Sequence, residues 1–405
     1  MPKTVLCVDI GTTSLKAGLF TAGGEAVFLY RKSFSEPDSR FVANQWMAAL
    51  AHCIKKISLT DYEICAVCVS GAGPTVVLQN GLTVRWNEAL PENLKIPEEF
   101  KRSLFIPKIL TAKTIFSDDF EKSDFVFSGP EFFIYQLTGA AVTILPEKRF
   151  EVAYWKKGDA AQLGFDEKKL PSLKSTGQLA GHLTFAAASA LGLKAGIPVF
   201  CGGPDFVVAL IGTNTLQPGR LCDRAGSSEG FNFCTDAAFF TPHTRTLPSV
   251  IPGLWNISVL SEESGRIFVE YKHRLEKEQG YVLDYPALVK EALTNPQSEG
   301  GKIVSRILEQ VRASVGLLKA ALAERGIELP AEMAVTGGQA KNDSWMQRKA
   351  DTLGMTLEIC NCADSELTGD ACAAWYGLGD YASIQDAANH IVKVTKRFIP
   401  QNENI

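Results

Sequence analysis

The chain has 405 residues, of which 46% are hydrophobic and 21% are charged, and its formal net charge is −4. This length exceeds one ordinary core and fits two domains of about 200 residues each. The charge balance, without a long run of lysine or arginine, argues against nucleic acid as a partner. No uncharged apolar stretch reaches the roughly 18 residues that span a bilayer, and no leader pattern precedes the first strand, so we expect a cytoplasmic protein that does not bind membranes.

The first informative feature is a hairpin predicted over residues 5–20. An apolar strand ends near Asp9, the turn reads Gly11-Thr12-Thr13-Ser14, and a second apolar strand follows. Such a turn offers backbone and hydroxyl donors to a phosphate, and the acid beside it can orient a magnesium ion. A hairpin that serves only the fold remains the alternative, because glycine turns after strands are common.

Strand-like and helix-like segments alternate along the chain, which predicts an α/β fold. Further strands are predicted at residues 25–30, 64–70, 76–78 and 197–201, and helices at residues 44–57 and 186–193. The strand at 197–201 runs into Gly202-Gly203-Pro204-Asp205. This pattern places an acid at the end of a buried strand.

A second hairpin, predicted over residues 219–233, repeats the order of acid, glycine and paired hydroxyls with Asp223, Gly226, Ser227 and Ser228. Two hairpins of one design, each opening about half of the chain, favour duplicated α/β domains that face each other. A chance resemblance is the alternative, because no longer internal repeat is visible.

A third glycine turn lies in the last third of the chain. An amphipathic helix is predicted around residues 303–318, then a strand at 333–336, the pair Gly337-Gly338 and a helix start. Glycines let a backbone approach a ligand closely, and a helix N-terminus offers free N–H groups to a phosphate or a base. A connection that merely needs positive φ is the alternative. Two final helices are predicted at 371–378 and 384–394.

Ten cysteines and five histidines form no pattern typical of a metal site. The pair Cys65 and Cys68 has CxxC spacing, but no second pair follows at zinc-site spacing. We therefore expect reduced thiols, most of them buried.

The glycine turns and acids, taken in this order, resemble those of the FGGY-type carbohydrate kinases, and in particular the xylulose kinases, within the actin, Hsp70 and sugar kinase superfamily. The resemblance covers nearly the whole chain. It implies an α/β fold of two ribonuclease H-like (actin-like ATPase) domains flanking a nucleotide and sugar cleft. Residues 1–214 would form the sugar-binding domain with the first phosphate motif and the catalytic acid, and residues 215–405 the nucleotide-binding domain.

The resemblance also implies a reaction, in which the γ-phosphoryl group of ATP passes to a hydroxyl of a sugar, for example a pentulose or another ketose, or of a polyol. Asp205 would be the general base, because a hydroxyl nucleophile needs a proton acceptor within reach; an acid that caps the following helix is the alternative. Asp9 and Asp205 would hold Mg²⁺. Residues implied to bind ATP are Gly11, Thr12, Thr13, Ser14, Gly226, Ser227, Ser228, Gly337, Gly338, Gln339 and Asn342. Residues implied to bind the sugar are Ser70, Gly71, Pro74, Thr75, Trp86, Asn87, Glu88, Asp205 and Phe206. Lys16, on the second strand, is expected to be solvated.

Several positions depart from the family pattern. Small residues at 72–75 replace a Gln-Met-His run, and Trp86-Asn87-Glu88 lacks the arginine that usually follows in this motif. Phe206 replaces an amide beside the catalytic acid. These positions select the substrate by hydrogen bonding, so the sugar stays open, as does the choice between monomer and homodimer.

Two other functions compete with the kinase. One is a catalytically weak sugar or nucleotide sensor on the same fold, favoured by the altered sugar loop and opposed by the retained Asp9 and Asp205. The other is an Hsp70-like ATPase, for which we find no residues that could form a peptide-binding domain.

Overall fold

The computed structural model describes residues 1–35, 40–226, 228–261 and 264–401. The chain divides into two units, the first formed by residues 1–212 and 366–391 and the second by residues 213–365 and 392–405. The expected boundary at 214/215 therefore lies close to residue 213, where the chain first passes from one unit to the other. The second unit, however, is not one continuous segment, as the expected second domain was. Residues 366–391 return to the first unit because their helices pack against it.

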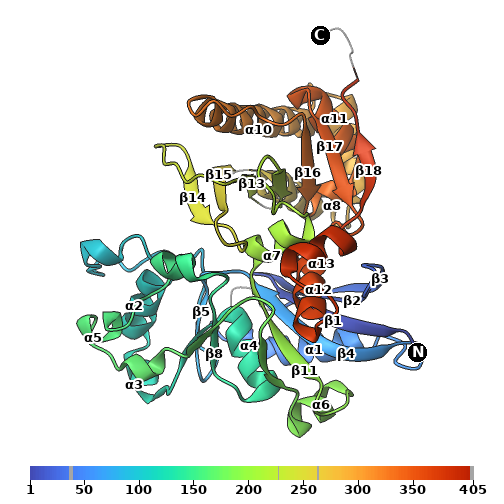
Figure 1. Cartoon of the computed structure of the whole chain (residues 1–405). Helices are drawn as coiled ribbons and strands as arrows, with labels where there is room; N and C mark the ends of the chain where they lie inside the picture. Colours follow the sequence, from blue (N-terminus) through green and yellow to red (C-terminus); the bar gives the residue numbers. More distant parts are fainter. Residues whose placement is uncertain (36–39, 227, 262–263, 402–405) are drawn as a thin grey trace. The chain divides into compact units, whose positions relative to one another are not determined.

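The first unit is built on a six-stranded sheet in the order β10-β11-β4-β1-β2-β3 (Figure 1). Its strands are β1 (Lys3–Ile10), β2 (Ser14–Thr21), β3 (Ala26–Ser33), β4 (Glu63–Gly71), β10 (Leu179–His182) and β11 (Pro198–Pro204). The hairpin β1–β2 is antiparallel, whereas β4 runs parallel to both β1 and β11. The predicted opening hairpin and the strands that flank it are confirmed.

Two layers of helices cover this sheet. Leu6, Val8 and Ile10 alternate along β1 and enter a core that includes residues of α1 (Trp46–Ile54), α4 (Gly129–Thr138) and α6 (Phe185–Leu191). The helices α7 (Asp205–Gly212), α12 (Ser365–Leu378) and α13 (Ile384–Ile391) belong to the opposite layer. Figure 1 shows α12 and α13, in red, beside α7, in green. Since side chains alternate between faces, Asp9 lies on the face opposite to Val8 and Ile10.

The chain between β4 and β10 adds smaller elements to this unit. Two short sheets pair β6 (Thr83–Val84), β5 (Val76–Leu78) and β7 (Val126–Ser128), and β8 (Val142–Ile144) with β9 (Ser172–Lys174). The helices α2 (Ile106–Ile115), α3 (Ser117–Lys122) and α5 (Asp159–Gln162) accompany them. A separate small core of Phe100, Ile106 and Leu110 holds part of this region together.

The second unit is built on a seven-stranded sheet in the order β14-β15-β13-β12-β16-β17-β18. Its strands are β12 (Leu221–Ala225), β13 (Glu229–Thr235), β14 (Arg245–Pro248), β15 (Trp255–Ser261), β16 (Glu332–Thr336), β17 (Thr356–Cys360) and β18 (Val394–Phe398). Its helices are α8 (Gly265–Gln279), α9 (Tyr285–Thr294), α10 (Glu299–Ala323) and α11 (Asp343–Leu353). The apolar stripe of α10 enters the core of this unit beside Phe231 and Phe233.

The two sheets share a six-stranded topology, to which the second sheet adds β14 at one edge. In the first unit an antiparallel β3-β2-β1 ribbon continues through parallel β4 and β11 to antiparallel β10. In the second unit an antiparallel β15-β13-β12 ribbon continues through parallel β16 and β17 to antiparallel β18. The expectation of two α/β units, each opened by a hairpin, is confirmed.

Other sequence-based expectations hold with small shifts. The helix predicted at 44–57 is a 3₁₀ turn at Val42–Gln45 followed by α1, and the last helix ends at Ile391, before β18. All ten cysteines are free thiols, nine of them buried. Across the described residues, no helix is long and apolar enough to cross a membrane.

Glycine is required where α12 meets α7. A Cβ added at Gly369 would overlap the backbone carbonyl oxygen of Val208. A Cβ added at Gly316, inside α10, would meet nothing within 4 Å. Both positions are helical, so the same substitution separates close packing from helix propensity.

We expect Gly369→Ala to destabilise the protein, because the overlap with the Val208 backbone forces α12 away from α7. Overpacking of this kind costs roughly 1–3 kcal/mol or more. Gly316→Ala, the control, should be neutral or stabilise by about 0.5–1 kcal/mol, because alanine favours the helix. Thermal melts of both variants measure the difference. Equal melting temperatures would contradict the packing described here.

Candidate active site

Three neighbouring strands of the first unit end at one edge of the sheet, and the predicted site residues Asp9, Ser70 and Asp205 lie there. Asp9 on β1 is in register with Ser70 on β4, and Ser70 is in register with Gly203 on β11, which leads into Asp205. The carboxyl ends of parallel strands are the usual place for a ligand in an open α/β sheet. The structure therefore brings Asp9 and Asp205 to a position suited to a site.

Asp9 is a buried carboxylate with one cation beside it. Its Oδ2 atom lies 3.1 Å from Nζ of Lys16, which also lies 3.4 Å from Oε2 of Glu366 on α12. The expectation that Lys16 is solvated is wrong, because Lys16 stands opposite Asp9 in the β1–β2 register and its side chain is only 13% exposed. Within the described chain, Oδ1 of Asp9 is buried without a hydrogen-bond partner.

Burial raises the pKa of Asp9 from 3.8 to about 6, against the opposing effect of Lys16 and with further increases from the charges of Glu366 and Asp205. The influence of Asp205 on Asp9 shows that the two carboxyl groups are close enough to interact. One lysine thus faces several acids, and the surplus of negative charge favours a cation.

Asp205 begins helix α7 and is half-buried. Its Oδ1 atom accepts a hydrogen bond of 2.6 Å from the backbone N–H of Phe206. A capping side chain bonds the N–H two or three residues further on, so this bond does not decide for the capping alternative, and the role of general base stays a proposal. The ring of Phe206 lies 6.3 Å from that of Phe150 and is half-buried.

Ser70 does not face an open site. Its side chain is fully buried, and its hydroxyl donates a hydrogen bond of 2.7 Å to Oδ2 of Asp370 on α12. Burial holds the pKa of Asp370 well above its usual range. Gly202 must be glycine here, since a Cβ would overlap Asp370 and the Val69 backbone. Ser70 therefore satisfies a buried acid, in contrast to the sugar contact implied by the family pattern.

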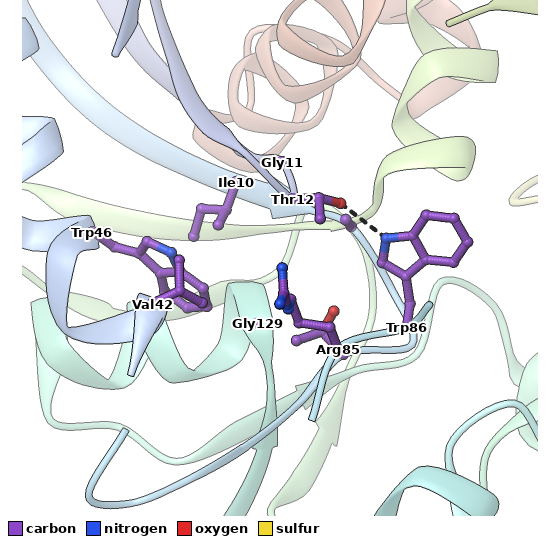
Figure 2. A pocket seen from close by; sticks show the side chains of 10 residues that line it. Ile10, Gly11, Thr12, Val42, Trp46, Arg85, Trp86 and Gly129 are labelled. Atoms are coloured by element: carbon purple, nitrogen blue, oxygen red, sulfur yellow. Dashed lines mark hydrogen bonds between the residues drawn. The ribbon is translucent and has the colours of Figure 1, made fainter. Parts of the chain in front are cut away.

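A pocket with an empty volume of about 300 Å³ opens beside the end of β1 (Figure 2). Its lining residues are Ile10, Gly11, Thr12, Val42, Trp46, Ala72, Thr75, Arg85, Trp86 and Gly129. The pocket brings the phosphate turn, through Gly11 and Thr12, together with the sugar motifs, through Thr75 and Trp86.

The tryptophan motif reaches this pocket through two residues. The indole N–H of Trp86 donates to Oγ1 of Thr12 at 2.9 Å, as Figure 2 shows. Arg85, which precedes Trp86, lines the same pocket, so a guanidinium is present even though the family's usual arginine is missing. Asn87 is exposed, and Glu88 accepts a weak bond from the Arg85 backbone N–H at 3.4 Å.

The other predicted residues of the phosphate turn and of the sugar loop differ in their exposure. Thr13 is exposed, whereas Ser14 is buried as the first residue of β2. Gly71 packs against the Ile10 backbone, and Pro74 is half-buried after a cis peptide bond. Sequence reasoning missed Val42, Trp46 and Arg85. Only Arg85 carried a signal, as a charged residue adjoining the tryptophan motif.

In the second unit, the glycine turns meet each other. Gly337 has a φ of +97°, and a Cβ there would lie 2.6 Å from the carbonyl oxygen of Ala225, which precedes Gly226. Around Gly338 a Cβ would meet nothing within 4 Å, so this position borders open space. Ser228 is exposed at the hairpin turn, and Ser227 lies outside the described residues.

The buried side chain of Gln339 links these turns through hydrogen bonds. Its Nε2 atom donates to Oγ of Ser264 at 2.8 Å and to the carbonyl oxygen of Gly226 at 3.4 Å. Its Oε1 atom accepts from the indole of Trp345 at 2.6 Å. Asn342 caps α11 through a bond of 3.0 Å from the Trp345 backbone N–H. These bonds give Gln339 and Asn342 structural duties in addition to any contact with a nucleotide.

A second pocket, with an empty volume of about 270 Å³, adjoins these two side chains. Its lining residues are Gly265, Phe268, Tyr285, Val289, Ile307, Gln339, Asn342 and Trp345. Apolar and aromatic walls with two amide groups are suited to a flat, partly polar ligand such as a nucleobase.

The acid of the second hairpin has a different environment from Asp9. Asp223 lies three residues before Gly226, whereas Asp9 lies two residues before Gly11, and a shift of one residue turns a side chain to the other face. Asp223 therefore points into the protein, where Lys349 of α11 bonds it at 2.7 Å and also bonds Glu229. All three side chains are fully buried.

In this cluster one lysine has to balance two buried acids. Burial and the nearby Glu229 hold the pKa of Asp223 well above its usual range. Burial alone would lower the pKa of Lys349, but its two acidic partners raise it above its usual range. Glu229 also accepts a hydrogen bond from Ser264, which in turn bonds Gln339. Lys349 thus supports the turns at Gly226 and Gly337 from behind.

The surroundings of Asp9 fit a magnesium ion. Among the described residues there is no group of three or more His, Cys, Asp and Glu side chains that could hold a metal by themselves. Magnesium, however, keeps several waters and binds through one or two carboxylates together with phosphate oxygens. The buried, unpaired Oδ1 of Asp9 and the adjacent Asp205 provide that kind of donor set.

Comparison with solved structures defines the class of fold. The chain superposes on a xylulose kinase from Lactobacillus acidophilus with a TM-score of 0.76 at 15% identity, covering 98% of this chain and 94% of the other. It superposes on a glycerol kinase from Plasmodium falciparum with a TM-score of 0.76 at 14% identity, covering 99% and 94%. The chain thus has the mixed α/β fold of these structures, with two ribonuclease H-like (actin-like) domains, as predicted.

Sequence comparison then shows which family the chain resembles. Residues 292–378 match the C-terminal domain of the FGGY family of carbohydrate kinases. An autoinducer-2 kinase from Yersinia enterocolitica is 24% identical over 293 residues, which cover 62% of this chain and 55% of that protein. The chain thus spans about half the length of the curated relatives that it matches. The resemblance to the FGGY kinases is confirmed.

Because the raised pKa of Asp9 favours its neutral form in the folded protein, the folded state holds this proton more tightly than the unfolded state between about pH 4 and 6. The associated stability is present below pH 4 and is lost as the pH rises through 6. We expect the stability of Asp9→Asn relative to wild type to rise by about 2–3 kcal/mol from pH 4 to pH 7. Urea unfolding at several pH values measures it. The exposed Asp118→Asn serves as control, and an equally flat profile for both variants would disprove the burial of a titrating Asp9.

Removing Lys349 leaves two buried acids without a cation. We expect Lys349→Met to destabilise the protein by about 3–5 kcal/mol, as is usual for a broken buried pair. Lys349→Met combined with Glu229→Gln should lose less, because only one acid then remains. Chemical unfolding compares the two variants, and an equal or greater loss in the double variant would contradict the charge balance described for this cluster.

Proposed function

We propose that the chain is an ATP-dependent carbohydrate kinase, which transfers the γ-phosphoryl group of ATP to a hydroxyl of a sugar or polyol. A ketose such as a pentulose is the first acceptor to consider. The observation that carries the proposal is the pocket of the first unit, where the phosphate turn at Gly11 and Thr12 meets Thr75 and Trp86. The similarity to xylulose, gluconate and glycerol kinases supports the same class of acceptor.

In the proposed reaction Asp205 accepts the proton of the attacking hydroxyl. The new bond forms between that oxygen and the γ-phosphorus while the bond from phosphorus to the ADP oxygen breaks. Thr12 and Thr13 in the first unit, and separately the turn at Gly226 and Ser228 in the second, would offer hydrogen-bond donors to phosphate, since positioning and charge neutralisation account for most of the catalysis of phosphoryl transfer. Gly337, Gly338 and Asn342 border the nucleoside.

Asp9 and Asp205 would hold Mg²⁺, with Lys16 limiting the negative charge around it. The ion, when bound, neutralises charge on the phosphate oxygens. Lys16 keeps Asp9 in place through their contact of 3.1 Å, and Glu366 holds Lys16 from the other side. The chain's own contribution is thus an oriented carboxylate and an adjacent proton acceptor.

We expect ADP release that depends on an added acceptor when the protein is supplied with Mg²⁺, ATP and a panel of pentuloses, hexuloses and polyols. Asp205→Asn should lower kcat by about 10²–10⁴-fold, the usual loss on removing a general base. The exposed Asp118→Asn is the matched control and should leave kcat unchanged. Acceptor-independent release, or release that Asp205→Asn does not affect, would reject the kinase proposal.

The same protein preparation can also distinguish the kinase from the alternative, a sugar or nucleotide sensor. A sensor would bind Mg²⁺–ADP and an acceptor in calorimetry while releasing no ADP from ATP. The altered sugar loop at residues 72–75 is the observation that keeps this alternative in view.

A further inference from the structure

The indole of Trp46 is a buried hydrogen-bond donor without a partner. The residue is 3% exposed, and in the described part of the chain its Nε1 atom has no acceptor. An unsatisfied buried N–H costs free energy of folding and therefore calls for an explanation. Trp46 lines the pocket of the first unit, so a bound ligand is a natural source of the missing acceptor.

The other polar side chains of this pocket are mostly donors as well. In Figure 2 Trp46 and Val42 lie on one side, Thr12 and Trp86 on the other, with Arg85 between them. A guanidinium has five N–H donors, so Arg85 can serve a ligand in addition to a protein group. Among the described lining residues only Thr12 and Thr75 have side chains that can accept, and Thr12 already accepts from Trp86.

A pocket wall made of hydrogen-bond donors distinguishes keto and carboxylate oxygens from alcohol oxygens. A keto or carboxylate oxygen only accepts hydrogen bonds, and donors satisfy it completely. An alcohol at the same place adds an O–H that must find its own acceptor, and a buried O–H without one is penalised. The donor set at Trp46 and Arg85 therefore favours a ligand with a carbonyl or carboxylate group over the corresponding polyol.

We propose that Trp46, with Arg85, is a specificity-determining residue that donates its indole N–H to a keto or carboxylate oxygen of the acceptor. This inference rests on the proposed function and narrows it. Ketoses and sugar acids are accepted, whereas polyols of equal length are disfavoured.

Two matched pairs of compounds test the inference, each differing only at one carbon: xylulose with xylitol, and gluconate with sorbitol. Binding is measured by calorimetry in the presence of Mg²⁺–ADP, so the result does not require turnover, and failure of the kinase proposal stays distinguishable. In at least one pair we expect the carbonyl or carboxylate member to bind roughly tenfold or more tightly, the size of one hydrogen bond to an otherwise unsatisfied group.

The matched variants are Trp46→Phe and Trp375→Phe. Trp375 on α12 is also 3% exposed with an indole nitrogen that lacks a partner in the described chain, but it does not line the pocket. Trp46→Phe should reduce the preference to about threefold or less, since the donor is gone. Trp375→Phe should keep it. No binding of any compound, no preference in wild type, or a preference that survives Trp46→Phe would overturn the inference.

A spectroscopic measurement covers the case in which Trp46→Phe fails to fold. Wild-type protein labelled with ¹⁵N-tryptophan has six indole N–H groups. The signal of Trp46 should shift on addition of xylulose or gluconate and that of Trp375 should not. An unchanged Trp46 signal at saturation would also overturn the inference.

Discussion

The first unit depends on a carboxylate that is buried at the end of a central strand. Because side chains alternate along β1, Val8 and Ile10 enter the core while Asp9 faces the layer that contains α12. Lys16 stands opposite Asp9 across the hairpin, and Glu366 on α12 holds Lys16 in turn. A second acid of α12, Asp370, is satisfied by Ser70 on the next strand. The return of residues 366–391 to this unit is therefore part of how its acids are held in place.

The second unit repeats the sheet but uses its charges differently. The shift of one residue between Asp9 and Asp223, relative to the glycine of each turn, sends Asp223 into the core, where Lys349 and Glu229 complete a closed cluster. The two hairpins thus have the same topology, but their acids have different roles. In one hairpin the acid stays at a sheet edge with surplus negative charge, and in the other it braces the turns at Gly226 and Gly337.

Much of the fold could be predicted because local patterns determine it. Alternating apolar runs bounded by glycine predicted both hairpins, and the order of the glycine turns predicted the resemblance to the FGGY kinases. The partners of Lys16 and Ser70 could not be predicted, since Glu366 and Asp370 lie 350 and 300 residues away in sequence. The same is true of Gln339, whose amide binds three separate segments. Trp46 lies within the helix predicted at residues 44–57, and its lack of a hydrogen-bond partner is visible only in three dimensions.

The central claim is that Asp9 is held buried, close to Asp205, with too little positive charge to balance it until a cation arrives. A ¹³C-carboxyl NMR titration of Asp9 tests this claim most directly. We expect a pKa of about 6 in the free protein, and a much lower pKa with Mg²⁺ and ADP bound, because the cation favours the ionised carboxylate. A pKa near the ordinary value of 3.8 that does not respond to Mg²⁺ and ADP would contradict it.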